Sequence, residues 1–152
     1  MSIVVNARRV RNQAMEVRVV KPLQFVDQTP QTTGMQRLAA ISHQLAGSEY
    51  LWAGVMLAEP NTTSSVHHHG SLETVVYVLS GKSRVRWGSR LEHEVDLEPG
   101  DFLLIPPYMP HQEINPSPDQ TTTWVVVRSG QEAVVVNLAK THAGEYVAMD
   151  AD

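Results

Sequence analysis

Cysteine is absent from this chain of 152 residues. Its absence excludes disulfide bonds, thiolate nucleophiles, iron–sulfur clusters and zinc sites built on cysteine. The chain also has no surplus of positive charge, because 12 Lys and Arg stand against 16 Asp and Glu, for a net charge of −4. We therefore do not expect a nucleic acid as a partner, since nothing is available to neutralise a phosphate backbone.

Long apolar runs are missing as well. No segment approaches the roughly 18 consecutive apolar residues of a membrane span, so no membrane partner is expected. The first 20 residues contain Arg8, Arg9, Arg11 and Arg18 and no continuous apolar stretch, which argues against a signal peptide. Together with the lack of cysteine, this predicts a cytoplasmic protein. The length fits one domain with a core of its own.

Helical periodicity is scarce, and short runs rich in Val, Leu, Ile and Trp take its place. Most of these runs end at residues that favour turns, such as Gly, Pro, Ser and Asn. Residues 35–46 fit an amphipathic helix as well as a strand ending near Ser42, and we favour the strand because the rest of the chain is strand-like. The predicted strands cover residues 17–21, 51–57, 75–79, 83–87, 91–97, 102–105, 124–128 and 133–137.

Turn signals about 8–12 residues apart are typical of a β-sandwich or barrel, so the predicted fold class is all-β. We interpret residues 31–140 as the barrel. Residues 1–30 are predicted to be an arm that adds a strand to this barrel or to a partner subunit. Residues 141–152 are predicted to be a C-terminal tail.

Histidine is what stands out: there are seven, and His67, His68 and His69 are consecutive. In an extended strand alternate side chains share a face, so His67 and His69 point one way and His68 the other. Glu73 follows after a Gly-Ser turn that can bring it back, and His111 is a fourth candidate downstream. Three imidazoles and a carboxylate suit one divalent transition metal ion (Fe, Mn, Ni, Co or Zn). The alternative is a solvated histidine patch.

Two segments resemble the paired signature motifs of the cupin superfamily. The first motif, G-x5-H-x-H-x3–4-E-x6-G, is matched by His67, His69, Glu73 and Gly81. The second, G-x5-P-x-G-x2-H-x3-N, is matched by four residues: Gly100, Pro106, His111 and Asn115. The resemblance implies a single-domain cupin, with a double-stranded β-helix or jelly-roll barrel, an N-terminal strand arm and a metal site of His67, His69, Glu73 and His111. It also implies a homodimer.

Three departures from the family pattern affect these expectations. Asn61 stands at the opening glycine of the first motif, and Tyr108 at the glycine of the second. Seven residues rather than six separate Glu73 from Gly81, so that Thr74 occupies the glutamate position when counted back from Gly81. Either a β-bulge near residues 73–75 turns Glu73 inward, or Glu73 points away and the site has three histidines.

A second carboxylate, Glu113, shares the strand face of His111. It is a candidate ligand, a candidate general acid or base and our candidate catalytic residue, or else an exposed residue near a strand end. His43, His68, His93 and His142 are expected to face solvent. The candidate substrate-binding residues come from three observations. Alternation along the barrel strands gives Trp52, Tyr77 and Trp87. Tyr108 lies in the turn before His111, and Arg37 is the single basic residue of segment 35–41.

These features predict a mononuclear metal protein whose partner is a small organic molecule, most simply a metal-dependent enzyme of dioxygenase or of isomerase or lyase type. The ligand types do not fix the metal and so do not separate these reactions. The alternatives are a non-catalytic barrel that binds or senses a small ligand, and a metal-free barrel in which histidine is a base.

Overall fold

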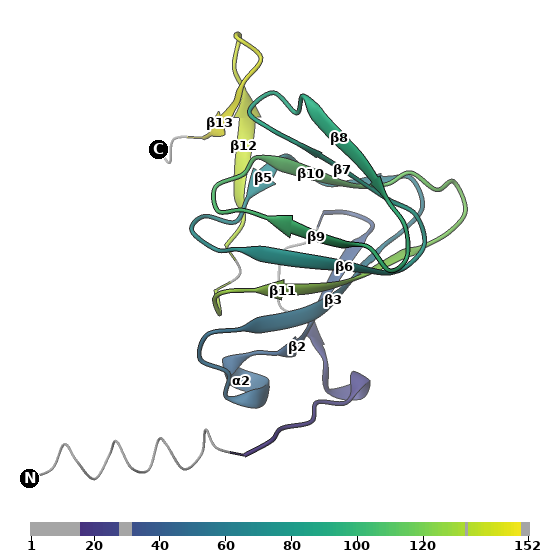
Figure 1. Cartoon of the computed structure of the whole chain (residues 1–152), viewed down its shortest axis with the longest axis vertical. Coiled ribbons are helices and arrows are strands. Elements are labelled where there is room, and N and C mark those ends of the chain that lie inside the picture. The colour runs from purple at the N-terminus through teal and green to yellow at the C-terminus, as the bar shows by residue number, and fades with distance from the viewer. Residues whose placement is uncertain (1–15, 28–31, 133, 150–152) are drawn as a thin grey trace, which may run out of the picture.

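The computed structural model describes residues 16–27, 32–132 and 134–149. These residues form two antiparallel β-sheets that face one another (Figure 1). The first sheet has the order β1-β2-β3-β11-β6-β9, and the second runs β13-β12-β5-β10-β7-β8, with β4 paired to β10. Short antiparallel strands in two layers are the jelly-roll arrangement that the sequence predicts.

The strands of the first sheet are β1 (Val26–Asp27), β2 (Met35–Ile41), β3 (Trp52–Ala58), β6 (Thr74–Ser80), β9 (Phe102–Ile105) and β11 (Thr122–Arg128). Those of the second are β4 (Thr62–Thr63), β5 (His67–His68), β7 (Ser83–Trp87), β8 (His93–Leu97), β10 (His111–Asn115), β12 (Val136–Lys140) and β13 (Tyr146–Ala148). A 3-10 turn, η1 (Pro22–Gln24), and a one-turn helix, α2 (His43–Ala46), complete the described elements. None of the helices in the described ranges has the length and apolar character needed to cross a membrane.

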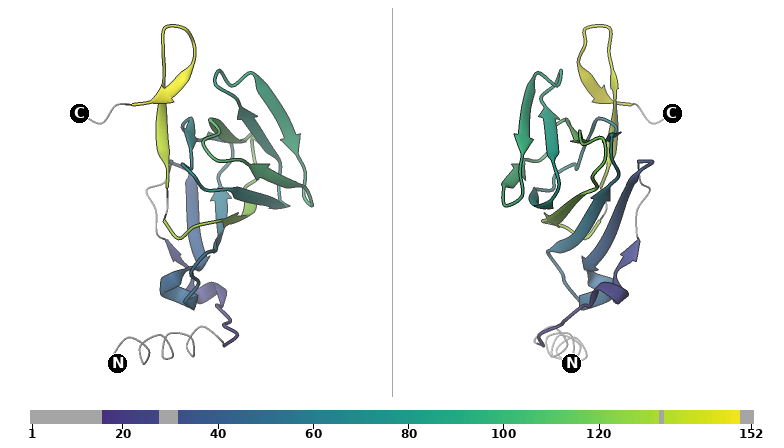
Figure 2. Two further views of the ribbon diagram at one scale, coloured as in Figure 1. Left: turned by 60° about the vertical axis from the view of Figure 1, so that its left-hand side comes forward. Right: turned by 90° about the vertical axis from the view of Figure 1, so that its right-hand side faces the viewer.

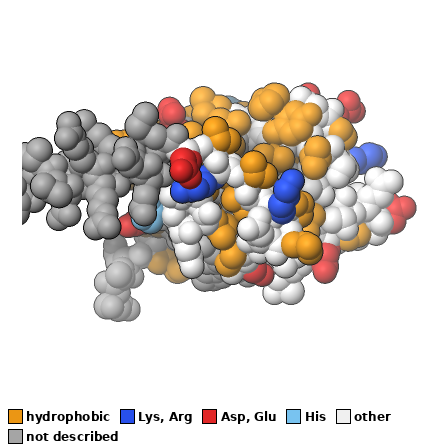
Figure 3. Space-filling model, turned by 90° about the horizontal axis from the view of Figure 1, so that it is seen from below, with side chains coloured by type: hydrophobic (Ala, Val, Ile, Leu, Met, Phe, Trp, Pro, Cys, Tyr) orange, Lys and Arg blue, Asp and Glu red, His pale blue; other side chains and the backbone are white. Residues whose placement is uncertain are grey.

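Period-two burial places the core between the two sheets. In β3 and β11 every second residue is buried, so one face of each strand points inward. The buried hydrophobic cluster is Met35, Ala39, Trp52, Met56, Ala58, Val76, Val78, Val85, Leu97, Ile105, Trp124 and Val126. On the face seen from below in Figure 1, hydrophobic side chains lie with charged side chains among them (Figure 3).

Segment 35–46, for which the sequence allows a helix or a strand, contains one of each. Residues 35–41 form β2, as predicted, and Ser42 then caps α2 by accepting a hydrogen bond from the backbone N–H of Leu45 at 3.2 Å. The predicted strand 17–21 does not form, because these residues pair with no strand in the described part of the chain, and Val17 is 93% exposed. Within the predicted arm only Val26 and Asp27 pair, with β2; residues 1–15 and 28–31 lie outside the described residues.

Part of the predicted C-terminal tail is a strand. Residues 146–148 form β13, which returns along β12 as a hairpin extending beyond the two sheets (Figure 2). The division into arm, barrel and tail otherwise stays a prediction, and residues 150–152 lie outside the described residues.

The motif positions have clear structural roles. Asn61 and Tyr108, which replace two family glycines, both have positive φ, of 55° and 58°. Glycine adopts this conformation without strain, and asparagine tolerates it better than tyrosine does. Asn115 is fully buried, and its side-chain nitrogen lies within hydrogen-bond distance of the carbonyl oxygens of Ala58 and Gln120. Asn115 thereby ties the end of β10 to β3 and to the loop before β11.

Candidate metal centre

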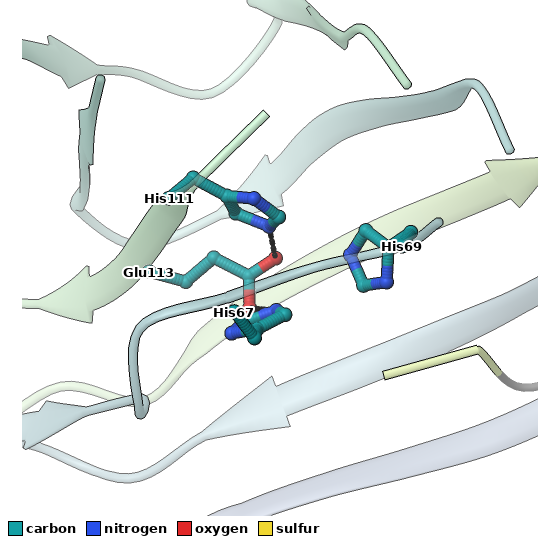
Figure 4. Close-up of side chains that lie close together, drawn as sticks. All are labelled: His67, His69, His111 and Glu113. Carbon is teal, nitrogen blue, oxygen red and sulfur yellow. Dashed lines mark ion pairs between the residues drawn. The ribbon is translucent and has the colours of Figure 1, made fainter. Parts of the chain in front are cut away.

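Three histidines and one glutamate converge inside the barrel (Figure 4). His67 lies on β5 and His69 just beyond its end, while His111 and Glu113 share the inward face of β10. The pairing of β10 with β5 sets His111 directly opposite His67. One ligand atom from each of the four residues lies within 4.8 Å of the others, and all four side chains are buried.

Backbone carbonyls fix the orientation of each imidazole. The Nδ1 atoms of His67, His69 and His111 lie 2.8, 2.9 and 2.9 Å from the carbonyl oxygens of Ser65, Val134 and Met109. Because a carbonyl oxygen only accepts, each Nδ1 carries the proton and each Nε2 keeps a free lone pair.

The Nε2 atoms of His67 and His111 are buried and have no hydrogen-bond partner within the described ranges. Each faces the Glu113 carboxylate, at 4.0 and 3.8 Å respectively. An unpartnered buried acceptor is costly, so two such atoms that face one carboxylate fit a site that binds a cation. Two atoms bonded to one ion at about 2.2 Å are at most about 4.4 Å apart. The distances from Glu113 to the two Nε2 atoms are within this limit. The most widely separated ligand atoms of the cluster, which lie within 4.8 Å of one another, need only a small inward shift to reach it.

The electrostatics of the cluster favour the ligand forms of its residues. Burial lowers the pKa of His69 to about 3, with the charge of Arg128 acting in the same direction. Burial likewise lowers the pKa of His111 to about 4, although Glu113 opposes this. For Glu113, burial raises the pKa, but the neighbouring histidines and Arg37 outweigh it and hold the pKa near 2. Neutral imidazoles and an ionised carboxylate are the forms that bind a metal.

These shifts predict that the metal-free protein loses stability in acid. His69 and His111 have folded pKa values below the ordinary 6.5, so the unfolded chain binds more protons as pH falls from 6.5 towards 3. Glu113 acts in the same direction between 4.5 and 2. The melting temperature of chelator-treated protein should therefore fall by several degrees between pH 7 and pH 4.5. A His142→Gln variant, which removes an exposed histidine, should keep the same profile.

A largely apolar cavity of about 240 Å³ adjoins the cluster and shares His111 with it. Trp87 lines this cavity, as the alternation predicts. The lining residues are Val85, Trp87, Leu103, Leu104, Ile105, Pro106, Met109 and His111. A compartment of this kind suits the apolar part of a small organic molecule.

Arg37 and Trp52 both face inward. Arg37 is 7% exposed, and its Nη2 lies 3.7 Å from the Met56 sulfur. It lines a second, smaller pocket that also contains His67 and Glu113. Trp52 is buried against Arg128, whose guanidinium carbon lies 5.2 Å from the ring centroid. Neither residue lines the apolar cavity.

The structure does not bring Glu73 into the cluster. Its side chain is exposed, while Thr74 is buried. The pairing of β6 is regular from Thr74 to Val78, and its one register shift against β11 lies at the other end of the strand, between Thr123 and Trp124, so no bulge near residues 73–75 turns Glu73 inward. The carboxylate beside the histidines is Glu113, which is 5% exposed rather than solvated.

Tyr77 and Tyr108 lie away from the site. Val76 and Val78 point into the core, so Tyr77 is on the outer face, where its ring packs 4.6 Å from that of Phe102. Tyr108 is 62% exposed and contacts the ring of His68. Of the four histidines that the sequence assigns to the surface, three are exposed: His43, His93 and His142. The fourth, His68, is half-buried.

One inward residue, Arg128, was not singled out from the sequence. Arg128 follows Trp124 and Val126 at intervals of two, and all three are buried. That alternation is the signal that indicates its direction.

Comparison with known proteins agrees with this architecture. Residues 54–128 match the model of the cupin domain family. The polyketide cyclase RemF from Streptomyces resistomycificus superposes with a TM-score of 0.66 at 22% identity, over 86% of this chain and 90% of that one. KdgF from a Halomonas species gives a TM-score of 0.63 at 18% identity, over 78% and 97%. At these identities the likeness shows the fold alone.

A curated relative adds a sequence match. The oxidoreductase cns1 of Cordyceps militaris is 27% identical over 77 residues, which are 49% of this chain and 10% of that protein. The chain thus matches about a tenth of that relative's length. On the family model, the barrel and the motif residues, the protein is a small cupin. It carries a buried group of three histidines and one glutamate of the kind that binds a metal.

Proposed function

We propose that this cupin is a metal-dependent enzyme acting on a small organic molecule. One divalent transition metal ion would be held by His67, His69, His111 and Glu113. The observation that carries the proposal is the pair of buried Nε2 atoms that face the Glu113 carboxylate and have no hydrogen-bond partner among the described residues. The apolar cavity beside His111 supports a substrate next to the ion.

The chain's own residues have separate tasks in this proposal. The three backbone carbonyls hold the imidazoles in one tautomer, so that no change of tautomer is needed for binding. Glu113 supplies negative charge, and Trp87 and Met109 exclude water from the apolar part of the substrate. The ion, when bound, supplies a Lewis acid that polarises substrate oxygens at its open positions.

Two reaction types remain as proposals, each with its own support. Isomerase or lyase chemistry is supported by the structural likeness to a polyketide cyclase, which covers most of both chains. In that case Glu113 would hold the ion through one carboxylate oxygen, and its second oxygen would be the nearest buried base for a proton of the substrate. Dioxygenase chemistry is supported by the sequence match to an oxidoreductase, which covers 49% of this chain.

Metal analysis with oxygen uptake tests the proposal. We expect protein purified without added metal to contain about one equivalent of a transition metal, and chelation to remove it. Reconstitution with Fe(II), Mn(II), Ni(II) or Zn(II) is then followed by incubation with small diketones, diols and 2-oxo acids. Oxygen uptake dependent on iron supports the dioxygenase, and oxygen-independent turnover supports the isomerase or lyase. Metal binding without any turnover points to a ligand-binding cupin, and failure to bind metal overturns the proposal.

A cytoplasmic location and a homodimer stay predictions. Fractionation of expressing cells tests the first, and light scattering of the purified protein tests the second.

A further inference from the structure

Arg128 is a buried cation that forms no ion pair with a carboxylate among the described residues. It ends β11, is 2% exposed, and its Nε has no hydrogen-bond partner in the described part of the chain. Among the described residues it has no ion pair within 4.0 Å, and its guanidinium lies over the face of the Trp52 ring. A cation–π contact offsets only part of the cost of taking a guanidinium out of water. A buried charge in this state calls for an anion.

The position of Arg128 connects it to the apolar cavity. Strand pairing sets Arg128 beside Trp52 on β3 and beside Thr74 on β6, and sets Thr74 beside Ile105 on β9. All four side chains are buried in the barrel interior. Ile105 lines the cavity together with His111. The row of residues therefore leads from Arg128 to the cavity beside the histidines.

Thr74 provides a second unsatisfied group in the same row. Its side chain is 1% exposed, and its Oγ1 has no hydrogen-bond partner within the described ranges. A hydroxyl next to a guanidinium can donate to the same anion. Two neighbouring buried groups that both lack partners are unexpected in a closed core and are expected in a subsite that a ligand completes.

The charges inside the barrel also favour an anion. Among the described residues, the buried ones that carry charge at neutral pH are Arg37, Arg128 and Glu113. Arg37 and Glu113 line one small pocket together, and each stabilises the charged form of the other. Arg128 is left in excess, and its charge reaches far enough to lower the pKa of His69 and of His111. A divalent ion at the histidines would add two further positive charges.

We propose that Arg128 and Thr74 form a subsite for the carboxylate of the substrate. The planar guanidinium fork matches a carboxylate, and the apolar cavity takes the remainder of the molecule. The substrate class is then a small carboxylic acid with an apolar chain and a second oxygen next to the carboxylate, such as a 2-oxo or 2-hydroxy acid. The inference that the substrate has a second oxygen rests on the proposed metal function, whereas the inference of a carboxylate subsite does not.

Binding of two probes of equal length tests this subsite. One is 2-oxopentanoate, and the other is 2,3-hexanedione, in which a methyl group replaces the carboxylate oxygen. Calorimetric titration of the Mn(II)-loaded full-length protein should show at least tenfold tighter binding of 2-oxopentanoate. Arg128→Gln should remove this preference by weakening only the carboxylate probe, Arg128→Lys should restore part of it, and Thr74→Val should reduce it less. Arg84→Gln, which removes an arginine of β7 outside the interior, should change nothing.

The outcomes separate this subsite from the metal proposal. If the protein takes up no metal but the metal-free protein binds 2-oxopentanoate in an Arg128-dependent way, the metal function fails and the subsite stands. Equal binding of both probes by the unmodified protein overturns the subsite, even if the Arg128 variants do not fold. Unchanged binding by a folded Arg128→Gln variant, or tighter binding of inorganic phosphate than of 2-oxopentanoate, overturns it as well.

Discussion

His111→Ala is expected to leave the purified protein with less than about a tenth of its metal, because loss of a ligand exceeds the 10–100-fold effects seen for residues that only support ligands. His111 is fully buried, belongs to the cluster and lines the substrate cavity as well. Truncating its ring also leaves a void in the barrel, so the metal-free variant should be less stable by about 2 kcal/mol or more. Elemental analysis and thermal denaturation of the chelated protein measure the two effects separately.

His68→Ala is the matched control, since it removes a neighbouring imidazole of the same motif. The His68 ring packs on Tyr108 and lies outside the cluster of four ligand atoms. This variant should retain its full metal content. A His111→Ala protein that is folded and carries as much metal as the unmodified protein would contradict the proposed centre.

Local alternation was enough to predict that His67 and His69 face the same side, whereas His111 was added by the resemblance to the second family motif. His67 and His69 are two residues apart in an extended segment, and a period of two fixes that both point to one side. The same rule set Glu113 on the face of His111. It did not settle whether Glu113 is buried, because burial near a strand end depends on the neighbouring strands. Here β10 is covered by β4 and β5 on one edge and by β7 on the other.

The choice between Glu73 and Thr74 depended on register. The motif spacing from the histidines favoured Glu73, and the spacing back from Gly81 favoured Thr74. A shift of one residue exchanges the two faces of a strand, so only the pairing of β6 with β9 and β11 decides. The same register places the side chain of Tyr77 on the outer face of the sheet.

Glycine positions were more informative than strand propensity. The motif comparison marks residues 61 and 108 as turn positions, and both have positive φ although neither is glycine. By contrast, residues 17–21 have the composition of a strand but no partner strand among the residues that the structure describes. Strand propensity reflects packing against neighbours, and a segment without neighbours cannot realise it.

Glu113→Gln is expected to lower the metal affinity by about 100-fold or more, an effect at least as large as that of losing a residue that supports a ligand. The amide keeps the shape of the side chain but removes the only buried carboxylate among the described residues. It also removes the charge that stabilises the guanidinium of Arg37. Breaking a buried charge pair costs about 3 kcal/mol, so the chelated variant should also melt earlier. Competition with a chromophoric chelator measures the affinity.

Glu73→Gln makes the same chemical change at an exposed position, six residues from His67 instead of within the cluster. Its metal affinity and its melting temperature should equal those of the unmodified protein. The two variants together distinguish the register of this structure from the spacing of the family motif. If Glu73→Gln loses the metal and Glu113→Gln retains it, the family spacing holds, and Glu113 returns to the role of a proton-transfer residue beside a site completed by Glu73.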